Sequence, residues 1–162
     1  MMTNYKMFID ANIFIFTITE NPKYIRSCEA LLNSIRNNKI KAYTSVNVVE
    51  EVVYKIMMFE LVEKYALEFK EIKSFLKKNP EVVRELEKPW RVLNDIKNLM
   101  EILDVTYDDL SESGNLSKKY SLLPNDALSV AVMKRNNIWI IASNDSDFER
   151  ADEIEVWVPD AG

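Results

Sequence analysis

The sequence contains no histidine and a single cysteine, and these two shortages exclude several kinds of chemistry. Without histidine, the chain cannot form a Ser-His-Asp or Cys-His catalytic site, and it cannot bind zinc through imidazole. Cys28 alone cannot form an internal disulfide bond, which is typical of a cytoplasmic protein. Any reaction that this chain catalyses must therefore use carboxylates, hydroxyls, amides, amines or a bound metal ion.

The chain also has few glycines and no excess of positive charge. With only Gly114 and Gly162, the chain cannot form the glycine-rich loop that binds phosphates in Walker or Rossmann nucleotide sites. The net charge of −5 gives no general attraction to nucleic acid, so nucleic-acid binding would need a local patch.

Long apolar runs are absent as well. No run reaches the roughly 20 residues of a membrane span. Asp10 and Asn12 interrupt the apolar N-terminal segment, and no small-residue cleavage site follows them. We therefore expect neither a membrane segment nor a signal peptide.

Strand-like apolar segments alternate with helical patterns along the 162 residues, whose 48% apolar content suffices for one domain with a substantial core. This alternation predicts an α/β fold in which helices cover both faces of a parallel sheet. The predicted strands are 5–9, 40–45, 100–105, 138–143 and 154–159. The predicted helices are 12–19, 23–37, one from 46 onward, 107–120, 123–137 and a short one at 146–152.

The middle of the chain, residues 59–100, has a different character. Its pattern is helical and charge-rich, and only Pro80 and Pro89 interrupt it. Basic and acidic residues balance one another there, which is typical of solvated helix faces and does not indicate a nucleic-acid patch. We expect a helical insertion of two or three helices within a single domain.

Acidic residues stand where predicted strands end or helices begin, in four separate segments. Ligands of an open parallel sheet bind outside the carboxyl ends of its strands, so these segments should meet at one edge. The acids are Asp10 after the first strand, Glu50 and Glu51 in the helix after the second, Asp126 in the helix before the fourth, and Asp145 and Asp147 after the fourth.

Each acid alone has a structural explanation. Asp126 in a first helical turn gains about 0.3–1 kcal/mol from the helix dipole, and Asp145 or Asp10 could cap a helix. Together, however, the carboxylates would repel one another, at a cost of about 4 kcal/mol for a pair 4 Å apart at an effective dielectric constant of 20. A divalent cation removes this cost, and oxygen ligands suit Mg²⁺ or Mn²⁺. The sequence therefore predicts a metal site.

Four segments of the chain together resemble the acidic motifs of PIN-domain nucleases, in the order usual for that family. They are "FIDANIFI", "YTSVNVVEEV", "PNDALSVAV" and "IIASNDSDF". The resemblance covers roughly residues 5–58 and 101–160. It implies a single PIN-like domain over 1–162, a three-layer α/β fold with a parallel sheet of four or five strands between helices, and a helical insertion at 59–100.

The resemblance also implies an activity, namely metal-dependent endoribonuclease cleavage of RNA phosphodiester bonds with 5′-phosphate and 3′-hydroxyl products. Many small PIN proteins are VapC-type toxins of type II toxin–antitoxin pairs, so an antitoxin protein is a candidate partner. The implied cofactor is one or two Mg²⁺ or Mn²⁺ ions. The family's catalytic and metal-binding acids correspond to Asp10, Glu51, Asp126 and Asp145, with Asp147 as an additional candidate ligand.

The second acid is ambiguous from helical geometry, because Glu50 and Glu51 flank the apolar stripe of their helix almost symmetrically. The spacing from Thr44 and Ser45 in the motif favours Glu51. The polar residues expected to hydrogen-bond the site or the substrate are Asn12, Thr44, Ser143 and Asn144. Candidates for phosphate contacts are Lys118, Lys119, Lys134 and Arg135, each of which would also suit a solvated surface.

Two other functions compete with this interpretation. The first is a non-catalytic PIN-like module that binds nucleic acid or protein. An incomplete acidic set would favour this function, whereas all four acids are present here. A phosphoryl-transfer domain with an aspartyl nucleophile would begin in a similar way, but it needs a second aspartate where Asn12 stands or a later lysine at a strand end.

The helical segment in the middle is rich in large apolar residues. A peripheral helical pair would not bury all of them on one packed face, so they either form a core of their own or leave an exposed patch that marks a partner surface. We expect a homodimer with this region in or beside the interface, since a two-fold interface reuses one patch. The residues are Phe59, Leu61, Val62, Tyr65, Leu67, Phe69, Ile72, Phe75, Leu76 and Trp90.

Overall fold

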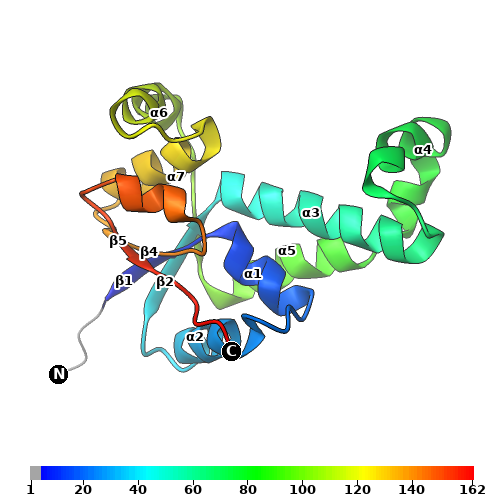
Figure 1. The fold of residues 1–162 in the computed structure, drawn as a ribbon, viewed down its shortest axis with the longest axis horizontal. Helices are drawn as coiled ribbons and strands as arrows, with labels where there is room; N and C mark the ends of the chain where they lie inside the picture. The colour runs from blue at the N-terminus through cyan, green and yellow to red at the C-terminus, as the bar shows by residue number, and fades with distance from the viewer. Residues whose placement is uncertain (1–4) are drawn as a thin grey trace.

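Five parallel strands form one sheet in the order β3-β2-β1-β4-β5 in a computed structural model, which describes residues 5–162 (Figure 1). All neighbouring strands run parallel. The strands are β1 (Lys6–Ile9), β2 (Lys41–Ser45), β3 (Glu101–Leu103), β4 (Ile140–Ala142) and β5 (Glu155–Trp157). The predicted α/β fold is confirmed, although all five strands are shorter than the segments that predicted them.

Helices surround this sheet and complete a three-layer arrangement. The helix α6 packs on α7, while α1 packs on both α2 and α3. The helices are α1 (Ala11–Ile18), α2 (Ile25–Arg36), α3 (Val46–Tyr65), α4 (Ile72–Lys78), α5 (Lys88–Leu99), α6 (Tyr107–Tyr120) and α7 (Pro124–Arg135). Three short 3-10 helices are η1 (Phe69–Glu71), η2 (Pro80–Glu85) and η3 (Ser146–Arg150). Within the described residues, none of the helices has the length and apolar character of a membrane span.

The strand order reverses beside β1, and this reversal positions the site. From β1 the chain builds β2 and β3 on one side of the sheet, and it later returns to add β4 and β5 on the other side. The crevice at such a switch point is where open α/β sheets bind ligands. The backbone N–H of Asp10 donates to the carbonyl of Ala142 over 3.0 Å, so the carboxyl ends of β1 and β4 lie side by side.

The middle segment is helical as predicted, but much of it packs on a core of its own. The predicted range 59–100 begins inside α3, which continues unbroken to Tyr65. Four buried residues form the second core: Leu61, Ile72, Val82 and Leu86. Of the ten large apolar residues considered above, seven belong to this core or pack against it. The other three, Phe59, Phe69 and Trp90, are exposed.

A buried carboxylate joins α3 to the start of α5. Glu60 is 5% exposed, and its side chain accepts hydrogen bonds from the backbone N–H of Glu87 and of Lys88 at 2.9–3.2 Å. These N–H groups begin α5 and have no partner within the helix, and the positive end of the helix dipole favours a carboxylate there. Glu60 therefore fixes where α5 starts relative to α3.

The Glu60→Ala substitution should destabilise the protein by about 2 kcal/mol, because it leaves the N–H groups of Glu87 and Lys88 without their acceptor. Urea unfolding measures this loss. The matched control is Glu63→Ala on the same helix, since Glu63 is exposed and its ion pair with Lys88 is at the surface. It should change stability by less than about 0.5 kcal/mol. Equal losses in both variants would contradict the capping role of Glu60.

Candidate metal centre

Asp10 lies directly after β1 and turns its carboxylate toward the end of β4. It occupies the N-cap position of α1, yet its side chain makes no capping hydrogen bond to that helix. Instead, its Oδ2 accepts hydrogen bonds from Ser143 Oγ at 2.7 Å and from Asn12 Nδ2 at 2.8 Å. The capping explanation considered for Asp10 is therefore wrong in the structure, and the carboxylate is oriented by residues of the two neighbouring strand ends.

Asn12 and Ser143 hold the two strand ends together. Asn12 Nδ2 also donates to Ser143 Oγ at 3.0 Å, and Asn12 Oδ1 accepts from the backbone N–H of Asn144 at 3.1 Å. The backbone N–H of Asp145 donates to Ser143 Oγ at 3.0 Å. These bonds fix the loop after β4 against the end of β1 and so determine where Asp145 stands.

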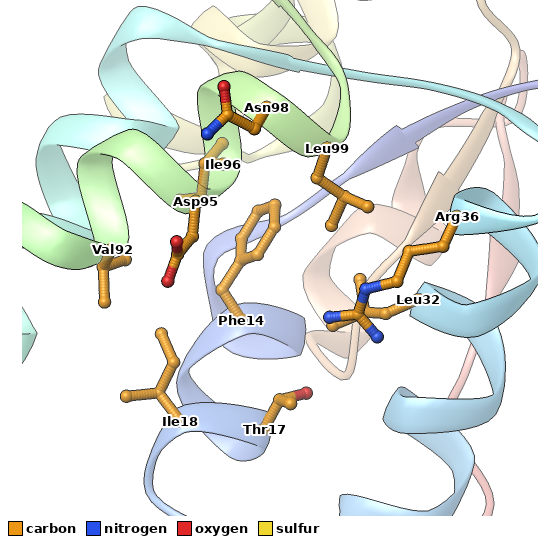
Figure 2. A pocket seen from close by; sticks show the side chains of 10 residues that line it. All are labelled: Phe14, Thr17, Ile18, Leu32, Arg36, Val92, Asp95, Ile96, Asn98 and Leu99. Carbon is orange, nitrogen blue, oxygen red and sulfur yellow. The ribbon is translucent and has the colours of Figure 1, made fainter.

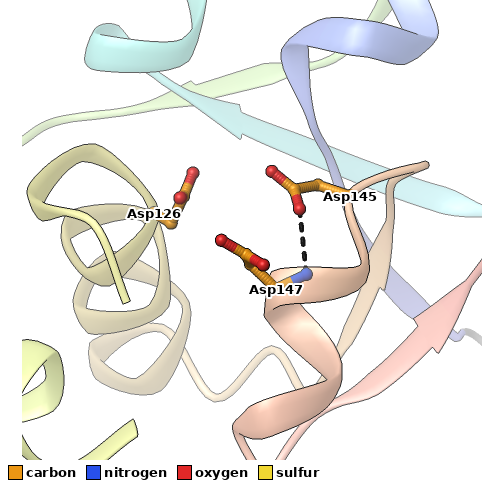
Figure 3. Close-up of side chains that lie close together, drawn as sticks. All are labelled: Asp126, Asp145 and Asp147. Atoms are coloured by element: carbon orange, nitrogen blue, oxygen red, sulfur yellow. Dashed lines mark hydrogen bonds between the residues drawn. The ribbon is translucent and has the colours of Figure 1, made fainter. Parts of the chain in front are cut away.

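Three further carboxylates gather opposite this network. Asp126 projects from the first turn of α7, and Asp145 and Asp147 belong to the loop and 3-10 helix after β4 (Figure 3). One carboxylate oxygen from each of the three lies within 4.8 Å of the other two. Asp145 also caps η3, because its Oδ1 accepts from the backbone N–H of Asp147 at 2.9 Å. Capping engages only one oxygen of Asp145, which leaves Oδ2 available for a cation.

Glu51 stands near this group, whereas Glu50 does not. Glu51 Oε2 accepts from Asn125 Nδ2 at 2.7 Å, and its Oε1 accepts from Lys55 Nζ at 2.5 Å. The negative charge of Glu51 acts on both Asp10 and Asp126. Asp10 and Glu51 lie outside the 4.8 Å group but border it, and Glu50 is exposed to solvent.

An amide bridge that the sequence did not reveal sets the position of Glu51. Asn47 Nδ2 donates to Asn125 Oδ1 at 2.9 Å and to Ser129 Oγ at 3.2 Å, and Asn125 then holds Glu51. The bridge joins the start of α3 to the start of α7. Its only sequence signal is that both asparagines lie inside the acidic motifs, where their side-chain directions are unknown before folding.

Thr44 has a structural role at this edge. Its side chain is fully buried, and its hydroxyl donates to the carbonyl of Ile9 at 2.9 Å. This bond joins the ends of β2 and β1, and Thr44 makes no hydrogen bond to the carboxylates among the described residues. Its contribution is therefore to hold β2 in place beside β1.

Three of the four basic residues proposed for phosphate contacts form ion pairs with acidic residues outside the candidate centre. Lys119 and Lys134 form ion pairs with Glu153 at 3.2 and 2.9 Å. Hydrogen bonds from these two lysines lower the pKa of Glu153 to about 2. Arg135 pairs with the buried Asp109 at 2.7 Å. These ion pairs favour structural roles over phosphate binding.

Negative charge is unfavourable at the site in the absence of a cation. The pKa of Asp126 is raised to about 6, first by burial and then by the negative charges around it, which are those of Asp145, Asp10, Glu51 and Asp147 in that order. Burial also raises the pKa of Asp10, and the hydrogen bond from Ser143 partly opposes this effect. The arrangement is suited to bind a positively charged group.

A hollow of about 520 Å³ lies elsewhere in the molecule, separate from the carboxylates. Figure 2 shows it between α1, α2 and α5, with Phe14, Leu99 and Arg36 among its lining side chains. None of the acidic-motif carboxylates lines it. The candidate centre is therefore the edge at β1 and β4.

The raised pKa of Asp126 predicts a pH-dependent stability. When a chelator keeps the protein free of metal, the carboxyl of Asp126 binds its proton more tightly in the folded protein than in the unfolded chain, where its pKa is about 3.9. The ionised form thus destabilises the fold above about pH 6, and this cost disappears as the pH falls from 6 toward 4. Relative to Asp126→Asn, the wild type should gain about 1 kcal/mol between pH 7 and pH 5, after allowance for solvent screening.

Denaturant unfolding at the two pH values measures this difference. At pH 7 without metal, Asp126→Asn should be as stable as the wild type or more stable, because it removes a repelling charge. A clear loss of stability in Asp126→Asn would mean instead that the carboxylate is needed as a partner of the helix dipole.

Comparisons with known proteins agree with this geometry. The family model of the PIN domain matches residues 7–154. Ribonuclease VapC2 of Methanocaldococcus jannaschii is 27% identical over 155 residues, which cover 96% of this chain and 95% of that relative. Both matches extend across the middle helices.

Two solved structures have the same fold. VapBC2 from Rickettsia felis, bound to a DNA fragment from their promoter, matches 96% of this chain and 99% of that one at 17% identity and a TM-score of 0.61. A toxin-antitoxin complex from Klebsiella pneumoniae matches 91% of this chain and 94% of that one at 15% identity and a TM-score of 0.54. The match to the family model shows that the chain belongs to the PIN-domain family, as its four acidic motifs predicted.

Proposed function

We propose that the protein is a cytoplasmic, metal-dependent endoribonuclease that hydrolyses RNA phosphodiester bonds. The observation that carries this proposal is the convergence of Asp126, Asp145 and Asp147, with Asp10 and Glu51 beside them, at the switch point of the sheet. Membership of the PIN-domain family and the ribonuclease name of the M. jannaschii relative support RNA as the substrate.

The carboxylates fit Mg²⁺ or Mn²⁺. Two oxygens on opposite sides of a Mg²⁺ ion stand about 4.2 Å apart, because each metal–oxygen distance is about 2.1 Å. The oxygens of Asp126, Asp145 and Asp147 lie within 4.8 Å of one another, so small side-chain rotations would let all three bind one ion. The charges of Asp10 and Glu51 act on Asp126, so these two acids are candidates to complete the site or to help hold a second ion. A bound cation would also keep Asp126 ionised at neutral pH.

The protein's own residues would prepare the reaction. Asn12 and Ser143 hold Asp10 by its Oδ2, and the N–H of Asp147 holds Asp145 by its Oδ1, so both carboxylates are oriented before substrate arrives. Asn125 orients Glu51 in the same way. When bound, a divalent ion activates water as the nucleophile and offsets negative charge on the attacked phosphate. Preorganised carboxylates avoid reorganisation during that step.

We also propose that the protein is the toxin of a type II toxin–antitoxin pair and that an antitoxin protein is its partner. The VapC name of the M. jannaschii relative supports this role. The K. pneumoniae structure with the same fold is a toxin-antitoxin complex, which supports a protein partner.

The function is tested by RNA cleavage with and without Mg²⁺ or Mn²⁺. The wild type should cut a labelled RNA only when the metal is added. Glu51→Gln should reduce cleavage at least about 100-fold, because Glu51 faces Asn125 and the acids, whereas Glu50→Gln on the exposed side of the same helix should retain most activity. The reverse result would move the second acid by one residue.

Metal binding is measured separately by thermal unfolding. Mn²⁺ should raise the melting temperature of the wild type and have a smaller effect on the Asp10→Asn plus Asp126→Asn double variant. Equal shifts would show that the metal binds elsewhere. Metal binding without any RNA cleavage would favour the non-catalytic module.

We further propose that the protein forms a homodimer through α5. Trp90 and Leu93 are 41% and 42% exposed and stand one turn apart on this helix, and a two-fold interface would cover both side chains with the same patch of a second copy. Light scattering at micromolar concentration should give the mass of a dimer, and Trp90→Arg should give a monomer. The control Tyr107→Arg, at an exposed position on α6, should remain dimeric; a monomeric wild type would contradict the proposal.

A further inference from the structure

A groove of about 710 Å³ lies beside the carboxylates, between α1, α3 and the segment formed by η1 and α4. Two residues belong both to the groove and to the candidate metal centre. Asn12, which lines the groove, donates to Asp10, and Lys55, which also lines it, pairs with Glu51. The groove is therefore continuous with the site at which the phosphodiester bond would be cut.

Aromatic side chains of the groove are unusually exposed for an apolar surface. Tyr54, Phe59 and Phe69 are 47%, 39% and 58% exposed. The rings of Phe59 and Phe69 meet edge to face with centroids 5.7 Å apart, and both residues line the groove. Exposed aromatic faces are the platforms on which single-stranded nucleic-acid binders stack unpaired bases.

The charge of the groove is opposite to that of the chain as a whole. Its lining includes Lys55, Lys70 and Lys73 and no acidic residue, although the net charge of the protein is −5. Lys55 and Lys70 pair with Glu51 and Glu68, at sites open enough to solvent that such pairs hold weakly. Lys73 makes no ion pair within the described residues. Three lysines among aromatic side chains complement a polyanion with exposed bases better than they complement an apolar protein segment.

The dimensions of the groove suit a short stretch of nucleic acid. Glu51 and Phe59 lie eight residues apart on α3, which corresponds to about 12 Å along the helix axis. Three or four stacked nucleotides cover this length at about 3.4 Å each. A strand whose phosphate lies at the carboxylates would therefore bring its third or fourth base to Phe59 and Phe69.

We infer that this groove binds unpaired bases of the RNA on one side of the cut phosphate, so that the enzyme selects single-stranded segments. The inference rests on the proposed ribonuclease function and adds a substrate subsite to it. Phe59 and Phe69 stack the bases, and Lys70 and Lys73 contact the phosphates between them. Duplex RNA, whose bases are already stacked and paired, cannot use the subsite.

The first test measures binding of a 5′-labelled ten-nucleotide oligouridylate by fluorescence anisotropy, in chelator and at low salt so that no cleavage occurs. Phe69→Leu keeps an apolar side chain but removes the ring, and it should weaken binding at least about fivefold. Lys73→Gln should weaken binding and reduce the slope of affinity against salt by about 0.7. The matched controls are Tyr107→Leu, which removes an exposed ring on α6, and Lys77→Gln, which removes an exposed charge of α4 outside the groove.

The second test measures cleavage of the same RNA with Mn²⁺. The groove variants should raise KM and leave kcat nearly unchanged, because they remove contacts away from the reacting phosphate. The wild type should cut an RNA duplex of equal length poorly. Phe69→Leu should not change the rate at which this duplex is cut.

The outcomes separate this inference from the proposed function. If the groove variants lose affinity while the wild type cuts no RNA, the subsite stands and the ribonuclease proposal fails. If the wild type cuts RNA and the groove variants bind and cut like their controls, the subsite is overturned and the ribonuclease proposal stands. The subsite is overturned if the wild type does not bind the oligonucleotide. It is also overturned if the groove variants weaken binding of a protein segment but bind the oligonucleotide as tightly as the wild type.

Discussion

Mutual repulsion of carboxylates at the ends of β1 and β4 is the constraint on which the rest of the structure depends. A chain that collects these acids at one edge must hold them against a force that drives them apart and into water. Short parallel strands fix the edge, and Thr44 and the N–H of Asp10 join neighbouring strand ends. Side-chain bonds from Asn12 and Ser143 then orient Asp10. The scaffold thus maintains a concentration of negative charge at this edge, which the protein's own ion pairs within residues 5–162, Lys55 with Glu51 and Arg150 with Asp147, offset at only two of the five acids.

The fold could be predicted from the sequence because it depends on local, periodic signals, and the family because four acidic motifs resemble those of PIN-domain nucleases. Apolar runs ending in acids mark the strand ends, and parallel strands bring those ends to one edge whatever the strand order. The site residues were named for the same reason, and the structure brings Asp126, Asp145 and Asp147 together with Asp10 and Glu51 nearby. Their assignment as metal ligands remains a prediction.

Other features could not be predicted because they depend on side-chain directions and on contacts between distant segments. The bridge from Asn47 through Asn125 to Glu51 joins residues 78 positions apart. Lys119 and Lys134 looked available for phosphate, but Glu153 occupies both. The lysine-lined groove could not be predicted from the balanced charges of the middle helices. It is formed by one face from each of three segments, α1, α3 and the segment of η1 and α4, which meet only in the folded protein.

The second core has a consequence for how such a protein can diversify. The acids rest on the sheet, whereas the outer wall of the groove rests on the small core around Leu61 and Ile72, joined to α5 through Glu60. Substitutions that are far apart and share no partners tend to act independently. Changes in the wall could therefore alter which RNA is accepted without displacing the carboxylates. Related chains could therefore catalyse the same reaction and differ in RNA specificity.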